Sequence, residues 1–236
     1  MSELHELVVN KFAIEVLSSF SNINTASVFN PIDYSVRDID RTRFGVYTGL
    51  KAPFSFGVSP TKKIAQSLDA LGTDKVYLSE KNDHILIKSE EDEKEIRIKF
   101  TEPKHIDPPP PGSYTPEAFQ KMAVLDFVLT GSEIKEINKI NKLLENTEIE
   151  FKVSPGELVI KTYEDQIEMA SDTFQIKKEI DYQGKGFKLV FDSSYFSYPI
   201  NGDYRVYLSE QIMIFQYIGD IDGYLMYGFG KKTVRR

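Results

Sequence analysis

Side chains that could carry out covalent or metal chemistry are few and scattered in this chain. The three histidines, His5, His84 and His105, have no neighbouring ligand or nucleophile at a useful spacing. The chain has no cysteine, which excludes disulfides, thiol nucleophiles and cysteine-ligated zinc or iron–sulfur sites. The sequence therefore predicts no catalytic residue, no metal site and no cofactor, and we do not expect an enzyme.

One acidic motif, Asp220-Ile221-Asp222-Gly223, is similar to the beginning of a calcium-binding loop. It lacks the later oxygen ligands and the closing glutamate of an EF-hand. A turn between the last two expected strands explains it better. No glycine-rich phosphate-binding loop occurs in the chain.

Lysines on one side of an expected helix, over residues 130–146, are the more informative feature. At about 100° per residue, Lys135, Lys139 and Lys142 gather on one face, and the apolar residues of the stretch gather on nearly the opposite face. Thr130 or Ser132 can cap the start of this helix. Its lysine face could meet a polyanion or could be an ordinary solvated surface, and one helix alone does not decide between the two.

A second expected helix repeats this two-faced plan. Ser59 followed by Pro60 predicts its start, and Gly72 predicts its end. Apolar residues recur at helical spacing between positions 64 and 71, while Lys62 and Lys63 lie off that face. A third helix is expected from a cap at position 10 to about position 22, and Lys11 is its only cation.

Composition limits the possible partners. The net charge of −7 argues against binding nucleic acid with the whole surface, but it leaves room for a local basic stripe. The chain has 236 residues, 41% of them hydrophobic, and can bury the core of one large domain or two ordinary ones. It has no signal-peptide pattern and no apolar run long enough to cross a bilayer. We expect a soluble, intracellular protein that does not bind membranes.

The order strand, helix, several strands, helix, several strands occurs twice along the chain. Between the two halves, residues 101–122 interrupt the pattern with four consecutive prolines from Pro108 to Pro111, which favour an extended surface connector. We infer a duplicated α+β unit, with an N-terminal domain over 1–102, a linker over 103–122 and a C-terminal domain over 123–236. The expected strands are 4–9, 26–29, 34–38, 44–50, 75–79, 84–89, 95–100, 124–129, 148–153, 158–162, 166–170, 174–180, 187–191, 204–209, 212–217 and 224–229.

This duplicated layout resembles that of the DNA sliding clamps, which include proliferating cell nuclear antigen and the polymerase clamp of tailed phages. Three segments are similar to clamp segments beyond the layout: VRDIDRTRFGVY (36–47), the expected strand and helix over 56–71, and the closing strand GYLMYGFGKK (223–232). The chain departs from the family where Arg43 replaces the usual histidine and Lys231 a common proline. Its last helix is shortened to SSYFSYP, which leaves the fourth inner position without a lysine.

The resemblance implies the DNA clamp fold, with two similar domains that each place two inner helices in front of antiparallel sheets. It implies a sliding clamp, a processivity factor that encircles double-stranded DNA as a homotrimeric ring without reading its sequence. Its partners would be DNA polymerase, a clamp loader and other clamp-binding peptides. It would act in the cytoplasm of a prokaryotic or virus-infected host cell. The alternative is a clamp-fold accessory protein that is monomeric or part of a heteromeric ring and does not slide.

The resemblance also assigns DNA-binding and subunit-interface residues. Lysine suits the inner face because its compact charge makes phosphate contacts that carry no sequence information. The implied DNA-binding residues are Lys11, Lys62, Lys63, Lys135, Lys139 and Lys142. Ring closure would pair two edge strands; without the resemblance, two ordinary internal strands would be an equal alternative. The implied interface residues are Glu95, Ile96, Arg97, Ile98 and Lys99 on one subunit, and Gln166, Ile167, Glu168 and Met169 on the next.

A groove for a partner peptide is implied beneath the linker. Its expected residues are Ile39, Phe44, Ile106, Pro108, Phe229 and Gly230. Plain core positions are the alternative for Phe44 and Phe229. The basic tail, with Lys231, Lys232, Arg235 and Arg236, is either a frayed end or a contact for DNA or a partner.

Overall fold

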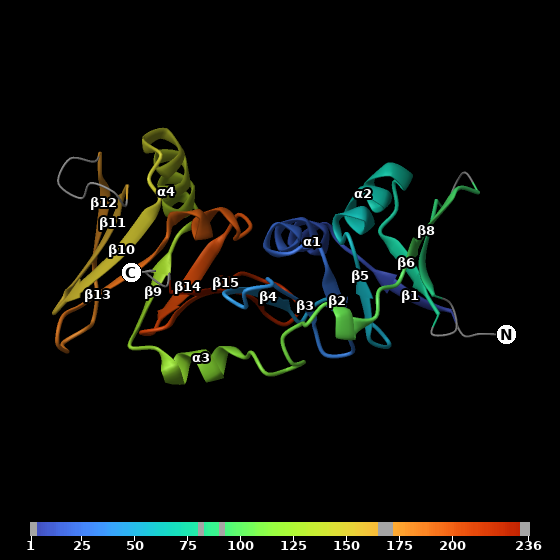
Figure 1. The fold of residues 1–236 in the computed structure, drawn as a ribbon, viewed down its shortest axis with the longest axis horizontal. Helices are drawn as coiled ribbons and strands as arrows, with labels where there is room; N and C mark the ends of the chain where they lie inside the picture. Colours follow the sequence, from blue (N-terminus) through green and yellow to red (C-terminus); the bar gives the residue numbers. More distant parts are fainter. Residues whose placement is uncertain (1–3, 80–82, 90–92, 165–171, 232–236) are drawn as a thin grey trace. The chain divides into compact units, whose positions relative to one another are not determined.

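The computed structural model describes residues 4–79, 83–89, 93–164 and 172–231. The chain divides into two compact units. The first unit holds the residues up to 115 together with 220–226, and the second holds 116–219 and the residues from 227 onward. Figure 1 shows helices α1 (Lys11–Ile23) and α2 (Lys62–Leu71) in the first unit and α4 (Gly131–Leu144) in the second.

Helix α1 (Lys11–Ile23) begins where the sequence predicts. The Asn10 side chain caps it by accepting a hydrogen bond from the Ala13 N–H at 2.8 Å. Its buried face includes Leu17 and Phe20, both fully buried.

Helix α2 (Lys62–Leu71) begins later than Pro60, so the predicted start is wrong by two residues. Thr61 occupies the cap position, but its side chain does not cap the helix. Instead, the Thr61 hydroxyl lies 2.6 Å from the Ser27 hydroxyl and 3.3 Å from the Val58 carbonyl. These contacts tie the helix start to strands β2 (Ser27–Phe29) and β5 (Phe56–Val58). Gly72 ends the helix in the left-handed conformation (φ 61°), as predicted.

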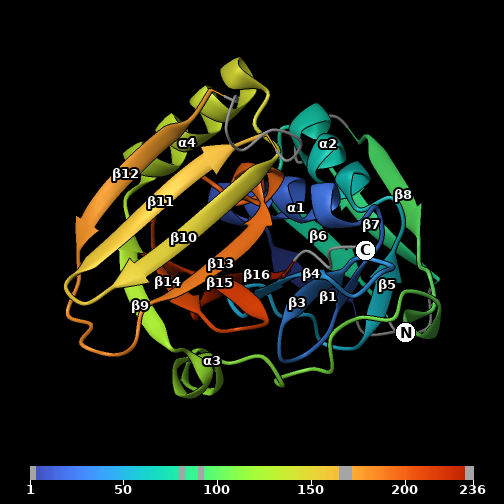
Figure 2. The same ribbon diagram turned by 60° about the vertical axis from the view of Figure 1, so that its left-hand side comes forward.

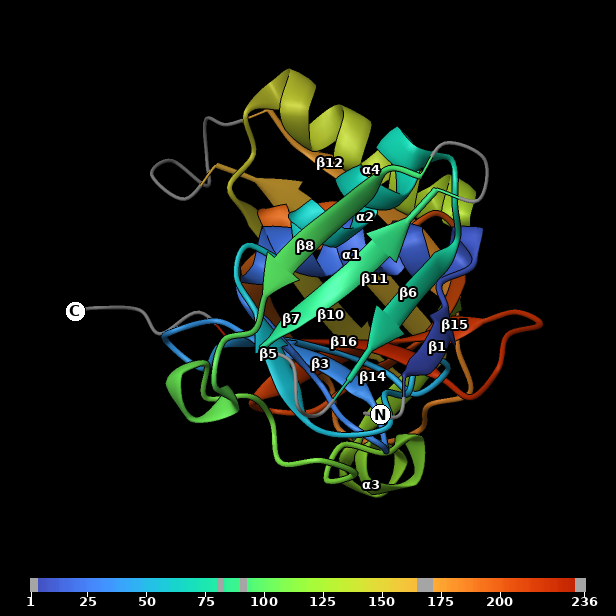
Figure 3. The same cartoon turned by 90° about the vertical axis from the view of Figure 1, so that its right-hand side faces the viewer.

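The first unit has two four-stranded antiparallel arrays, in the orders β1-β6-β7-β8 and β5-β2-β3-β4. Helix α1 contacts β3, β4 and α2, and α2 contacts β7 and β8. Figure 3 shows the sheet that ends in β8. The strands are β1 (His5–Val8), β2 (Ser27–Phe29), β3 (Tyr34–Arg37), β4 (Arg43–Tyr47), β5 (Phe56–Val58), β6 (Lys75–Leu78), β7 (His84–Lys88) and β8 (Glu95–Lys99).

The segment expected to be an extended connector contains a 3-10 turn, η1 (Pro103–His105), and a helix, α3 (Pro116–Met122). The expectation of extended structure is therefore wrong for 116–122. Thr115 followed by Pro116 is a helix-start signal that could have found α3.

The second unit repeats the plan around α4 (Gly131–Leu144), which contacts β11 and the 3-10 helix η2 (Ser193–Ser197). Its strands run in the orders β12-β11-β10-β13 and β9-β14-β15-β16 (Figure 2). They are β9 (Leu125–Leu129), β10 (Glu148–Ser154), β11 (Glu157–Tyr163), β12 (Phe174–Glu179), β13 (Phe187–Asp192), β14 (Asp203–Leu208), β15 (Ile212–Ile218) and β16 (Leu225–Gly230).

The α+β class with antiparallel sheets is confirmed. Each expected strand lies within three residues of an observed one at either end, except 166–170, which falls outside the described residues. Aromatic residues fill both cores, with Phe20 stacked on Tyr34 in the first unit and Phe151 in edge contact with Phe191 in the second. Among the described residues, no helix is long and apolar enough to cross a membrane.

Candidate nucleic-acid interface

Helix α4 is fixed at its start by a reciprocal pair of hydrogen bonds. The Thr130 hydroxyl accepts from the Glu133 N–H at 3.3 Å, and the Glu133 carboxylate accepts from the Thr130 N–H at 2.8 Å. Lys178 of β12 also pairs with Glu133. Burial alone would raise the pKa of Glu133, but the hydrogen bonds from Lys178 and Thr130 outweigh it and hold that pKa below its usual value.

The predicted lysine face of α4 is confirmed as an exposed face. Lys135, Lys139 and Lys142 are exposed, whereas Ile134 and Ile137 are buried against the unit. The three lysines fall within about 60° of one another around the helix axis. We call these three residues the α4 lysine face.

The other two helices carry less positive charge. Lys62 and Lys63 are exposed on α2, one turn or more before the exposed Asp69. Lys11 is exposed on α1, but the exposed Glu15 follows it by one turn and offsets its charge. In the part of the chain that the structure describes, none of the six predicted lysines takes part in an ion pair. Their ammonium groups are therefore available to a partner.

The fourth helical position is filled by the short η2, where Ser194 and Ser197 are exposed and no cation occurs. This agrees with the shortened helix read from the sequence. Exposed lysine on the helices is thus most concentrated on α4 and α2.

Edge strands limit two of the sheets. β8 is the outermost strand of its sheet, with Glu95, Arg97 and Lys99 exposed, Ile96 half-buried and Ile98 buried. The other predicted interface residues, Gln166, Ile167, Glu168 and Met169, lie outside the described residues. Among the described strands, β12 is the outermost on its side of the second unit's sheet.

The predicted groove residues of the first unit differ in accessibility. Ile39 is 91% exposed at the tip of the turn between β3 and β4, and Pro108 is half-buried. Phe44 and Ile106 are buried, since Phe44 stacks on Tyr114 with ring centroids 4.2 Å apart, and Ile106 covers the backbone of Gly57. Ile39 is therefore the most accessible residue of this set.

Neither of the two groove residues of the second unit is fully exposed. Phe229 is fully buried and stacks on Tyr195, with ring centroids 4.7 Å apart. Gly230, at the end of β16, is half-buried.

The turn that presents Ile39 is built around Asp38. Its carboxylate accepts hydrogen bonds from the N–H groups of Thr42 and Arg43 at 2.8 and 2.9 Å, and from the Arg43 guanidinium at 2.9 Å. Burial would raise the pKa of Asp38, but these bonds outweigh it and lower that pKa.

An ion-pair cluster that the sequence does not reveal attaches the connecting segment to this turn. Asp107 pairs with Arg37 at 2.7 Å and with Arg41 at 2.8 Å. The residues are about 70 positions apart, so no local pattern links them. Within the described residues, no group of histidine, aspartate and glutamate side chains could hold a metal ion.

Searches by sequence find no matching family model and no significantly similar curated protein. Solved structures do match. A crystal structure of the Helicobacter pylori beta clamp in complex with carprofen gives a TM-score of 0.66 at 12% identity, over 99% of this chain and 68% of that chain. The same clamp in complex with diflunisal gives 0.65 at 14% identity. The proliferating cellular nuclear antigen from Entamoeba histolytica gives 0.68 at 14% identity, over 99% of this chain and 100% of that chain.

Proposed function

Because the chain has the fold of the DNA sliding clamps, as the resemblance read from its sequence implied, we propose that it is a polymerase sliding clamp. In this proposal three copies form a ring around duplex DNA, and the ring tethers DNA polymerase and other replication proteins. The clamp domains are 1–102 and 123–236, joined by the linker over 103–122. The protein holds its partners on DNA and catalyses nothing itself.

The observation that carries the proposal is the α4 lysine face. Three exposed lysines, which form no ion pair with any described residue, lie together on a helix of a chain whose net charge is −7. A local positive face on an acidic protein directs a polyanion toward that face. Lysine ammonium groups bind phosphates at any sequence and exchange between them readily. Lys62, Lys63 and Lys11 would add weaker contacts to the same duplex.

Ring closure requires an open strand edge on each of the two units. β8 supplies one such edge and β12 the other among the described strands, so we propose that β8 of one copy pairs with β12 of the next. This pairing would use Glu95 to Lys99 as predicted. It would place β12, which follows 166–170 in sequence, at the joint.

The partner-peptide site would centre on Ile39, the exposed apolar residue of the turn that Asp38 holds. Short peptides with apolar anchors from the polymerase, the clamp loader and other replication proteins would dock there. Pro108 of the linker belongs to the same unit and is half-buried.

Light scattering coupled to size-exclusion chromatography tests the ring. The proposal expects a mass near three times 27.0 kDa. A monomer at micromolar concentration, or a ring that forms only with a different chain, would favour the alternative of an accessory protein that does not slide.

A backbone variant makes this test specific to β8. The Phe100 N–H donates to the Asp83 carbonyl of the neighbouring strand end at 2.7 Å. Since N–H groups alternate in direction along a strand, the N–H of Arg97 points away from β7. Arg97→Pro removes this outward donor while leaving the β7 pairing in place. We expect Arg97→Pro to be a folded monomer and the matched control Arg97→Thr, which keeps the N–H, to remain a ring.

Topological binding can be tested without a loader. The protein is mixed with linear DNA, the DNA is ligated into a circle, and the complex is washed in high salt. The proposal expects retention on the circle and release once a restriction enzyme cuts it. Equal loss before and after cutting contradicts encirclement.

A further inference from the structure

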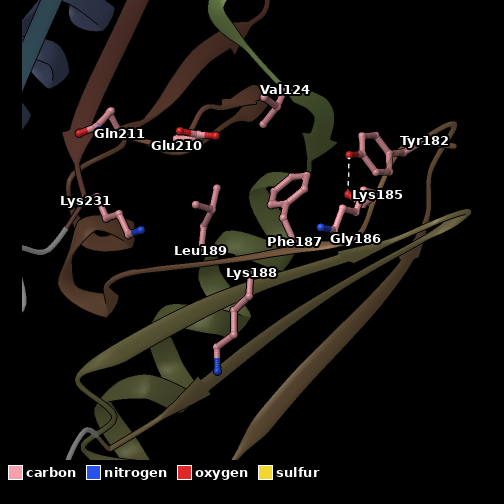
Figure 4. A pocket seen from close by; sticks show the side chains of 10 residues that line it. All are labelled: Val124, Tyr182, Lys185, Gly186, Phe187, Lys188, Leu189, Glu210, Gln211 and Lys231. Carbon is pink, nitrogen blue, oxygen red and sulfur yellow. Dashed lines mark hydrogen bonds between the residues drawn. The ribbon is translucent and has the colours of Figure 1, made fainter.

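The second unit contains a cationic pocket of about 550 Å³ at one end of its strands (Figure 4). The pocket is formed by the start of β9, the loop before β13, the turn between β14 and β15, and the end of β16. Its lining residues are Val124, Tyr182, Lys185, Gly186, Phe187, Lys188, Leu189, Glu210, Gln211 and Lys231. None of them belongs to the lysine faces or to the groove residues discussed above.

The pocket walls are held by hydrogen bonds. The Tyr182 hydroxyl donates to the Lys185 carbonyl at 2.9 Å, and the Tyr182 ring meets Phe187 edge-on with centroids 5.7 Å apart. On the opposite wall, the Lys231 N–H donates to the Gln211 carbonyl at 2.8 Å. Lys185 and Lys231, two of the lysines that line the pocket, are therefore held by backbone hydrogen bonds.

The floor of the pocket is apolar. Leu189 is buried, Phe187 is half-buried, and Val124 keeps 45% of its surface exposed. An apolar side chain of a ligand would cover the exposed surfaces of Phe187 and Val124, which stabilises binding by the area removed from water.

The charges of the pocket are unequal. Three lysines and one glutamate line it, and because Lys188 is paired with Glu150, two lysines are left against one glutamate in a chain of net charge −7. Lys188 is engaged by Glu150 at 2.7 Å and points away from the centre in Figure 4. Lys185 and Lys231 are exposed, and neither takes part in an ion pair within the described part of the chain.

We propose that this pocket binds a short acidic peptide segment of a partner protein, with an apolar residue between its carboxylates. The apolar side chain lies on Phe187 and Val124, and the carboxylates pair with Lys185 and Lys231. Charge complementarity selects this occupant, because two ammonium groups that take part in no ion pair within the described residues border an apolar floor, against a single carboxylate, Glu210. The inference concerns the second unit alone and does not depend on ring formation.

Fluorescence anisotropy tests the proposal with a labelled synthetic peptide, Asp-Asp-Leu-Phe-Asp-Glu, and with its uncharged counterpart, Asn-Asn-Leu-Phe-Asn-Gln. We expect the acidic peptide to bind at least tenfold more tightly than the uncharged one, and its binding to weaken as salt is raised. The double variant Lys185→Glu/Lys231→Glu should lower the affinity by about tenfold or more. The control matched in charge is the double variant Lys51→Glu/Lys88→Glu, at two exposed lysines of the first unit, which should leave the affinity unchanged.

Cross-linking locates the bound peptide independently of affinity. A photoreactive phenylalanine in the acidic peptide should attach to 182–189 or to 210–211, as read by mass spectrometry. Equal binding of both peptides, equal binding by the double variant, or attachment near Ile39 would overturn the proposal. These results would say nothing against the clamp function, which circularised DNA tests separately.

Discussion

The side chain of Arg37 contacts both the main-chain carbonyl and the side-chain carboxylate of Asp107. The Arg37 Nε donates to the Asp107 carbonyl at 3.0 Å, and its terminal nitrogen pairs with the Asp107 carboxylate at 2.7 Å. Arg41 pairs with the other carboxylate oxygen. Both Arg41 and Asp107 adopt positive φ angles, 58° and 51°, which side-chain-bearing residues rarely do without such support. The start of the connecting segment is therefore attached to the turn that presents Ile39.

Asp107→Asn should loosen this attachment, because an amide cannot pair with two guanidinium groups. We expect hydrogen exchange at the Ile106 N–H, which bonds to the Pro103 carbonyl at 3.0 Å, to become severalfold faster. Glu102→Gln is a matched control, since Glu102 lies on the same segment and pairs only with exposed neighbours. Unchanged exchange in Asp107→Asn would show that the ion pairs do not hold the segment.

Asp38 should make the turn between β3 and β4 sensitive to acid. Its pKa is lowered in the folded protein because hydrogen bonds from Arg43 and Thr42 outweigh the effect of burial. A lowered pKa stabilises the folded state above the unfolded value of about 3.9, and this contribution is lost as pH falls through the folded pKa. Asp38→Asn should cost about 1–3 kcal/mol at pH 7, measured by urea unfolding. The difference between the variant and the parent should shrink below about pH 4.

Charge reversal on the α4 lysine face should weaken DNA binding. In the variant Lys135→Glu/Lys139→Glu/Lys142→Glu, the plot of log affinity against log salt should become less steep by about 2–3. Each lost phosphate contact removes nearly one released counterion. The control reverses three exposed lysines outside the helices, Lys51, Lys88 and Lys152. Circular dichroism checks that α4 persists. Equal losses in both variants would mean that net charge, and not this face, governs binding.

Glu145→Gly should stabilise the second unit. Glu145 ends α4 in the left-handed conformation, with φ 54°, and places a carboxylate at the negative end of the helix dipole. Glycine removes both the conformational cost of the left-handed backbone and the unfavourable charge. We expect a gain of about 0.5–1 kcal/mol in the free energy of unfolding. Glu145→Ala separates the two causes, since alanine removes the charge and keeps the conformational cost. A loss of stability in Glu145→Gly would contradict the inference that the left-handed conformation of Glu145 costs stability.

The parts of the fold that depend on neighbouring residues were predictable from sequence. The spacing of Ile134, Ile137 and the α4 lysines defined both faces of that helix, and Asn10 and Thr130 act as the expected caps. The predicted start of α2 was wrong because a residue distant in sequence contacts Thr61 there. Ser27 engages the Thr61 hydroxyl across 34 positions.

The candidate site likewise combines features that were predictable from sequence with contacts that were not. Exposure of the lysines followed from helical periodicity, whereas the burial of Phe44 depends on Tyr114, 70 residues later. The attachment of Asp107 to Arg37 likewise joins residues that no sequence window contains together. These contacts are properties of the folded chain.

The open edge of β8 has a further consequence for the chain before it assembles. An exposed strand edge is a template for unplanned pairing with other chains, which leads to aggregation. Glu95, Arg97 and Lys99 put charge at every second position of β8, and Ile98 between them is buried. Charged side chains along an edge discourage such mispairing. The residues proposed to face a neighbouring subunit would thus also protect the newly made, unassembled chain.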